Sequence, residues 1–167
     1  MLKEGAKAPA FTLDGDEGKV SLADLRGKIA VVYFYPRDST PGCTREAQAF
    51  SARGKELAKL GAVVLGISKD SVASHGKFRE KYALTVKLLS DPDLAVQKAY
   101  GAYGEKTMYG KKVMGTIRST FVVDDKGMLA KVFPSVKVDG HDEAVLAVVK
   151  ELAGGAKKKA SKGDGAR

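Results

Sequence analysis

The chain has 167 residues, enough for one domain with a sizeable core, and its 44% hydrophobic content is ordinary for a folded protein. The longest apolar run, Ile29 to Tyr35, has the length of a buried strand and is too short to span a bilayer. These features argue against a membrane protein and against a largely disordered one. The N-terminal residues lack the pattern of a signal peptide, so we expect a cytoplasmic protein.

The net charge of +9 is spread unevenly. The fifteen residues from Ala153 carry four lysines and one arginine against one aspartate, a net +4. This segment is small, polar and charged, which predicts a folded domain over residues 1–152 and a flexible basic tail over 153–167.

Three short elements are predicted in the N-terminal part of the chain. Phe11 to Leu13 is an extended candidate, and Ser21 to Leu25 has the pattern of a capped helical turn. Ile29 to Tyr35 is rich in β-branched and aromatic residues and shows no alternation with polar ones. That pattern is typical of a central strand buried on both faces.

The segment that follows predicts a strand–loop–helix–strand unit. Pro36 ends the strand, a loop leads to Gly42, and apolar residues recur at helical intervals from 44 to 60. Residues 62–68 form a second apolar strand candidate. Two such strands around a helix indicate a mainly parallel sheet covered by helices, and therefore an α/β protein.

The second half of the chain predicts three helices and a hairpin. The helices are expected at 71–82, 92–100 and 142–152. Two strands are expected at 116–123 and 128–133, joined by the Asp- and Gly-containing turn 124–127. This arrangement adds an antiparallel hairpin beside the parallel part of the sheet.

The single cysteine, Cys43, lies between a buried strand and a long helix. The free amides and partial positive charge of a helix start stabilise a thiolate, which is the nucleophilic form of cysteine. The alternative is a small buried hydrophobic residue. An intramolecular disulfide is impossible with one cysteine.

The surrounding sequence favours the reactive alternative. Residues 35–44 read YPRDSTPGCT, which resembles the active-site loop of the peroxiredoxins: a proline, three residues, a threonine or serine, two residues and the cysteine. Pro36, Thr40 and Cys43 match that spacing. The string TPGCT followed by Glu46 is similar to the bacterioferritin comigratory protein or peroxiredoxin Q group.

The resemblance covers roughly residues 3 to 152. Further matching segments, in the same order as in the family, are Val64–Ser71, Ser74–Phe78, Leu88–Asp91, Tyr100–Gly101 and Ile117–Phe121. It implies a thioredoxin-like fold with a central mixed β-sheet flanked by helices. It also implies a peroxidase of antioxidant defence and redox homeostasis that needs no cofactor or metal and reduces hydrogen peroxide and alkyl hydroperoxides.

The resemblance also assigns roles to individual residues. Cys43 would attack the peroxide and become a sulfenic acid. Arg118 would stabilise the thiolate and help hold the substrate, and Thr40 would offer its hydroxyl. The backbone amides of Gly42 and Cys43 would donate to the peroxide, and Pro36 would shield the pocket.

The sequence departs from many relatives in lacking a second, resolving cysteine, whose place five residues after Cys43 is taken by Gln48. An external thiol is therefore expected: thioredoxin, glutathione with glutaredoxin, or Cys43 of a second copy in a dimer. We expect a monomer, with a dimer as the alternative. A peroxide sensor or thiol-relay protein on the same fold is the alternative function.

Other candidate sites have less support. His75 and His141 lie in polar helical or turn contexts, and a Cys–His pair would need one of them beside Cys43. One cysteine and two separated histidines make no metal-ligand cluster. The Lys157–Lys159 run lacks interleaved aromatic residues, which argues against nucleic-acid binding. Gly101 to Gly110 lacks the lysine and spacing of a phosphate-binding loop.

Overall fold

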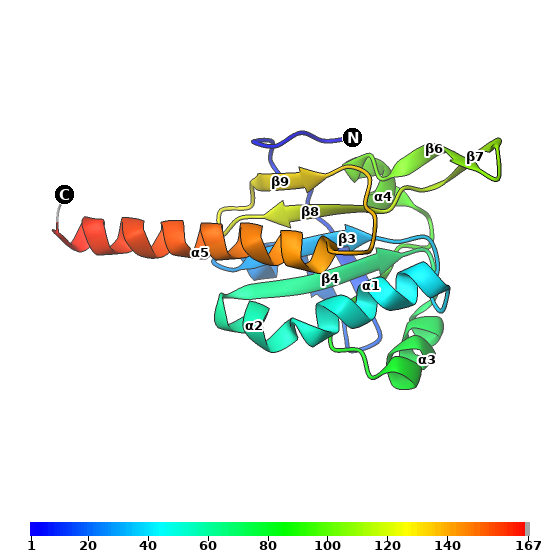
Figure 1. Cartoon of the computed structure of the whole chain (residues 1–167), viewed down its shortest axis with the longest axis horizontal. Helices are drawn as coiled ribbons and strands as arrows, with labels where there is room; N and C mark the ends of the chain where they lie inside the picture. The colour runs from blue at the N-terminus through cyan, green and yellow to red at the C-terminus, as the bar shows by residue number, and fades with distance from the viewer. Residues whose placement is uncertain (166–167) are drawn as a thin grey trace.

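A computed structural model describes residues 1–165 as a seven-stranded sheet flanked by helices (Figure 1). The sheet order is β2-β1-β5-β4-β3-β8-β9. Its strands are β1 (Thr12–Gly15), β2 (Val20–Ser21), β3 (Ile29–Phe34), β4 (Ala62–Ser68), β5 (Lys87–Ser90), β8 (Ser119–Val123) and β9 (Leu129–Phe133). Strands β3, β4 and β5 run parallel, whereas β1, β2, β8 and β9 pair antiparallel. The prediction of a mixed sheet is therefore confirmed.

Helices cover both faces of this sheet. They are the 3-10 turn η1 (Leu22–Leu25) and the α-helices α1 (Pro41–Ala52), α2 (Gly54–Lys59), α3 (Val72–Tyr82), α4 (Ala95–Tyr100) and α5 (His141–Gly165). Side chains of α1, α2, α3 and α5 pack in one apolar core, and those of η1 and α4 in the other. Within the described residues, no helix is long and apolar enough to cross a membrane.

Strand β3 is the centre of the molecule, and all six of its residues are buried. Alternate side chains enter different cores, because successive residues of a strand point to opposite faces. Tyr33 packs with Phe50 of α1, whereas Phe34 packs with Tyr100 of α4. The predicted burial of this strand on both faces is confirmed.

The predicted helix at 44–60 is two helices, and the first begins earlier than expected. Pro41 occupies the first helical position, where its missing N–H costs no hydrogen bond. The backbone leaves helical geometry at Arg53, after which α2 begins at Gly54. Cys43 consequently lies inside the first turn of α1.

The predicted strand at 116–123 is wrong as a single element. It is divided between β7 (Lys111–Thr116) and β8, and β7 pairs with β6 (Tyr103–Met108) in a separate hairpin that projects from the sheet (Figure 1). The turn at Tyr109 and Gly110 has positive φ at both positions, as a tight hairpin turn requires. The hairpin is largely solvated, so its sequence lacks the apolar runs that predict strands.

Helix α5 is longer than predicted. It was expected to end at residue 152 but continues to Gly165, and Figure 1 shows it extending beyond the sheet. The alanines and lysines of this segment favour a helix, whereas its glycines do not. The flexibility of the basic tail, and the division of the chain at residue 152, stay predictions. Residues 166 and 167 lie outside the described residues.

Gly66 in β4 is required by its neighbour in β3. It pairs with Tyr33, and a Cβ at this position would lie 2.7 Å from both Cζ and Oη of the fully buried tyrosine. Gly66→Ala is therefore expected to lower the free energy of unfolding by about 1–3 kcal/mol, measured by urea denaturation. Gly76→Ala is the control, because a Cβ there meets open space within α3 and should raise stability by about 0.5–1 kcal/mol. An unchanged midpoint for Gly66→Ala would contradict the packing.

Candidate active site

The loop between β3 and α1 brings Cys43 to the end of the central strand. Thr40 precedes the helix in an extended conformation, and its carbonyl accepts the first helical hydrogen bond from the Thr44 N–H at 2.9 Å. Pro41 follows, so Gly42 and Cys43 occupy the next two positions of the first turn. Amides in a first turn have no partner within the helix and concentrate positive charge at this point.

The guanidinium of Arg118 contacts the sulfur of Cys43. Its Nη2 donates to Sγ over 3.2 Å, and the cysteine is only 1% exposed. Arg118 lies between β7 and β8, and β8 pairs with β3 so that Ser119 stands opposite Phe34. This register places Arg118 at the end of β3 that is followed by the loop to Cys43.

A buried carboxyl group completes this cluster. Glu46 Oε1 accepts from Arg118 Nη1 at 2.6 Å, whereas Oε2 is buried and finds no hydrogen-bond partner among the described residues. Burial raises the pKa of Glu46 to about 7, against the opposing effect of the Arg118 charge. The arginine thus bridges a thiol and a carboxyl group that titrates near neutral pH. Glu46 was expected only as part of the motif around Cys43, although its spacing of three residues from Cys43 places both on one helix face.

The other predicted site residues surround the cysteine loop. A Cβ on Gly42 would lie 3.2 Å from Arg118 Nη2, so glycine at this position leaves room for the guanidinium. The Thr40 hydroxyl donates to the Arg37 carbonyl at 2.9 Å and makes no cap hydrogen bond to the helix. Pro36 is half-buried at the start of the loop. Their roles toward a peroxide stay predictions.

Both histidines are buried, which the polar sequence around them did not indicate. His75 has no exposed surface and hydrogen-bonds with Asp38, while His141 lies 2.7 Å from the Thr120 hydroxyl. Burial lowers the pKa of His141 to about 4. The imidazole rings of His75 and His141 therefore form their hydrogen bonds with groups other than Cys43.

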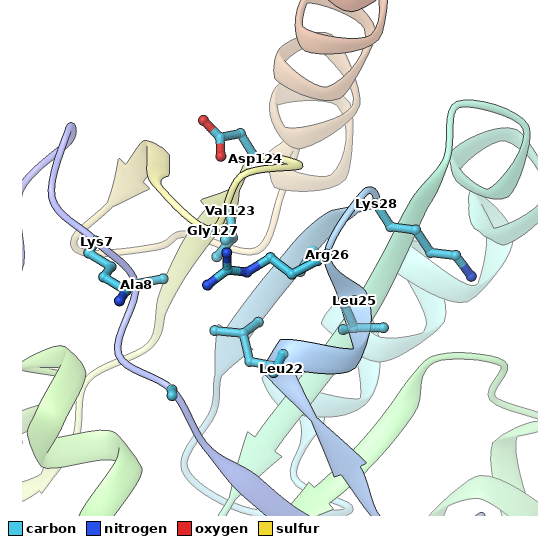
Figure 2. A pocket seen from close by; sticks show the side chains of 12 residues that line it. Lys7, Ala8, Leu22, Leu25, Arg26, Lys28, Val123, Asp124 and Gly127 are labelled. Atoms are coloured by element: carbon cyan, nitrogen blue, oxygen red, sulfur yellow. The ribbon is translucent and has the colours of Figure 1, made fainter.

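A separate hollow of about 90 Å³ lies at the far end of β3 (Figure 2). Ala30, near the start of that strand, lines it, whereas Cys43 follows the strand's other end. Figure 2 shows the side chains of Lys7 and Arg26 beside it. None of the predicted site residues lines this hollow. Within residues 1–165, no three acidic, histidine or cysteine side chains group as a metal site would require.

Glu46→Gln is expected to favour the Cys43 thiolate in the pH range where the Glu46 carboxyl group is otherwise charged, above about 7. Glutamine keeps an oxygen for Arg118 but stays neutral, so the arginine charge acts on the sulfur unopposed. The midpoint of Cys43 alkylation by iodoacetamide against pH should move down by about half a pH unit. Glu56→Gln, on the exposed side of α2, is the control and should leave the midpoint in place. A midpoint that stays or moves upward for Glu46→Gln would contradict this electrostatic coupling.

The same carboxyl group predicts a pH dependence of stability. The folded pKa of Glu46, about 7, lies above the ordinary value of 4.5. The unfolded chain therefore releases this proton at a lower pH than the folded chain does. The contribution of Glu46 to the free energy of unfolding is complete below pH 4.5 and is lost as the pH rises through 7. Urea denaturation at pH 5 and pH 8 should show a smaller loss of stability for Glu46→Gln than for the unmodified chain. An equal loss would contradict the raised pKa.

Comparison with known proteins identifies the class. Residues 5–132 match the AhpC/TSA family, and the chain belongs to this family of peroxiredoxins, within its Bcp or peroxiredoxin Q group. A Coxiella burnetii protein that carries the name peroxiredoxin bcp is 52% identical over 146 residues, or 87% of this chain and 97% of that protein. Peroxiredoxin Bcp of Bacillus subtilis is 44% identical over 149 residues, covering 89% and 95%.

Solved structures agree with the fold. Xanthomonas campestris peroxiredoxin Q superposes with a TM-score of 0.81 at 44% identity, covering 86% of this chain and 91% of that one. A variant of Xylella fastidiosa PrxQ gives 0.84 at 35% identity, covering 90% and 97%. The predicted thioredoxin-like fold and the predicted family are both confirmed.

Proposed function

We propose that this chain is a thiol-dependent peroxidase in which Cys43 reduces hydrogen peroxide and alkyl hydroperoxides. The observation that carries the proposal is the contact between Arg118 and the Cys43 sulfur at the first turn of α1. A permanent cation and free amides around a thiol favour the nucleophilic thiolate. Among the similar structures, one of the Xanthomonas campestris bacterioferritin comigratory protein is described by its alkyl peroxide reduction activity.

The first step is an in-line attack of the thiolate on one peroxide oxygen. A sulfur–oxygen bond forms and the oxygen–oxygen bond breaks, so the cysteine is oxidised to a sulfenic acid. The leaving oxygen takes a proton and departs as water or an alcohol. Arg118 and the amides of Gly42 and Cys43 would stabilise the charge that moves onto that oxygen.

Thr40 and Pro36 would shape the approach of the peroxide. The Thr40 hydroxyl donates to the Arg37 carbonyl, which leaves its oxygen lone pairs available to accept from a peroxide O–H. Pro36 has no side-chain donor or acceptor, and its half-buried ring would exclude water beside the sulfur.

The second step needs a thiol from outside the chain, because Cys43 is the only cysteine. That thiol attacks the sulfenic sulfur, water leaves, and a mixed disulfide forms, which a further thiol reduces. We propose thioredoxin, or glutathione with glutaredoxin, as the donor, acting on a monomer. Cys43 of a second copy is the alternative. A reactive thiol of this kind fits a reducing compartment such as the cytoplasm.

The test is peroxide consumption with three donor systems: dithiothreitol, glutathione with glutaredoxin, and thioredoxin with its reductase. Repeated turnover with any of them supports the peroxidase, and the protein donor that works identifies the partner. Turnover with dithiothreitol alone would contradict both proposed protein donors. If Cys43 is oxidised once and no donor restores it, the sensor or thiol-relay function is favoured. Absence of any Cys43 oxidation would overturn the proposal.

A further inference from the structure

A buried polar network lies under the loop that carries the site. Asp38, in the middle of this loop, has only 3% of its side chain exposed and accepts three hydrogen bonds. The donors are the Tyr35 hydroxyl at 2.6 Å, the Ser74 hydroxyl at 2.8 Å and His75 Nδ1 at 2.7 Å. The Asp38 N–H itself donates to Asp70 at 2.9 Å. The loop is therefore braced internally by Tyr35 and tied to α3 and to the segment between β4 and α3.

The contacts of His75 favour its charged form. Its Nε2 lies 2.9 Å from the Leu89 carbonyl of β5, which can only accept, so this nitrogen carries a proton. Its Nδ1 faces the Asp38 carboxylate, a second acceptor. Only an imidazolium can donate from both ring nitrogens. Burial lowers the pKa of His75, but the hydrogen bonds and charges around it, Asp38 first among them, raise it overall.

The charged and titratable groups that face His75 favour this charge. Asp38 approaches from the loop, Asp70 contributes its charge from the segment after β4, and β5 offers a carbonyl oxygen. Tyr35, the residue after β3, places its hydroxyl 3.4 Å from Nδ1. Burial raises the pKa of Tyr35 well above its ordinary value, so that phenol stays neutral. The two carboxylates therefore raise the affinity of His75 for its proton.

The network and the reacting sulfur share a neighbour, the fully buried Tyr33 phenol. Burial raises the pKa of Tyr33 most, and Glu46, Cys43 and Asp38 raise it further. Three groups that can carry negative charge thus share one region of low dielectric, where charges interact strongly. Without the His75 cation, the Asp38 charge would oppose formation of the Cys43 thiolate.

We propose that His75 is a positioning residue for the Cys43 reaction, which as an imidazolium neutralises Asp38 and holds the loop before α1 in place. The inference rests on the proposed function, in which Thr40 and Cys43 meet the peroxide together. The ion pair between His75 and Asp38 fixes the loop that positions Thr40 and Cys43. A neutral side chain at position 75 leaves the buried Asp38 carboxylate without its cation, which displaces the loop and makes the Cys43 thiolate harder to form.

The test compares His75→Gln, Asp38→Asn and the double variant, each checked for folding by circular dichroism. The rate constant for Cys43 oxidation by hydrogen peroxide is measured in a single turnover, and Cys43 alkylation by iodoacetamide is followed against pH. His75→Gln should lower the oxidation rate constant roughly 10- to 100-fold, as misplaced reacting groups do. Its alkylation midpoint should rise by about half a pH unit, and Asp38→Asn in the double variant should return it.

Tyr35→Phe is the matched control, because it removes one hydrogen bond to the same carboxylate and keeps the cation. Its alkylation midpoint should stay in place. A midpoint shift in His75→Gln that persists in the double variant would show a structural effect and overturn the proposal. So would an oxidation rate constant unchanged in His75→Gln.

A measurement on the unmodified chain guards against variants that do not fold. NMR titration of the His75 ring should show a midpoint above the ordinary value of 6.5, and a midpoint at or below 6.5 would overturn the proposal. The NMR and alkylation measurements need no peroxide. A failure of the peroxidase proposal, seen as an unmodified Cys43 that does not react with peroxide, is therefore distinguishable from a failure of this one.

Discussion

Replacement of Cys43 by serine is expected to abolish peroxide consumption, with kcat/KM reduced at least about 10³-fold. A serine hydroxyl stays protonated where a thiol ionises, so no comparable nucleophile remains. Serine is close in size to cysteine and can accept the hydrogen bond from Arg118, so the fold should persist. Peroxide consumption with dithiothreitol, together with the thermal unfolding midpoint, measures both expectations.

The control for this substitution is Gln48→Ser, which changes an exposed residue of the same helix. It should retain full peroxidase activity. Peroxide consumption by Cys43→Ser at a tenth of the original rate or more would remove the cysteine from the mechanism, provided that mass spectrometry shows no contaminating unmodified chain.

Loss of Arg118 is expected to have the second-largest effect. Arg118→Ala removes the donor to Cys43 and the cation proposed to stabilise the leaving oxygen, and losing one such group costs about 10²–10³ in rate. It also leaves Glu46 buried without its cation. We therefore expect the double variant Arg118→Ala/Glu46→Gln to be more stable than Arg118→Ala, with activity still low. Peroxide kinetics and urea denaturation of both variants test this.

Arg45→Ala supplies the matched control, because Arg45 is two residues from Cys43 but exposed, and it pairs with Asp139 on the surface. Such pairs contribute little, so activity should change less than about twofold. Similar losses in Arg45→Ala and Arg118→Ala would mean that general positive charge, rather than the contact with the sulfur, promotes the reaction. An unchanged alkylation profile in Arg118→Ala would also contradict its role toward the thiolate.

The sequence predicted the centre of the fold well, because buried strands leave a strong signal. Ile29 to Phe34 is apolar at every position, and a strand between two covered sheet faces has no other composition available. The βαβ unit, the later hairpin of β8 and β9 and the helix of residues 72–82 followed from similar patterns. Solvated strands such as β6 and β7 lack this signal, and local pairing across their turn stabilises them instead.

The residues around Cys43 were predictable to different degrees. Cys43 and Arg118 followed from the family resemblance, and the structure places them in contact. Glu46 could have been found from helical spacing alone, but its burial could not, since that depends on what packs above the helix. The pairing of His75 with Asp38 joins positions 37 residues apart, and only the folded chain shows that both are buried.

The cysteine and the arginine that contacts it are separated by 75 positions in the chain. They meet only when β8, one of the last strands, has paired with β3 at the register that sets Ser119 opposite Phe34. During synthesis, the thiol emerges long before its activating cation. A chain with β8 still undocked therefore lacks the contact between the guanidinium and the sulfur. Completion of the sheet is thus the step that assembles this cluster, because no earlier strand carries the arginine.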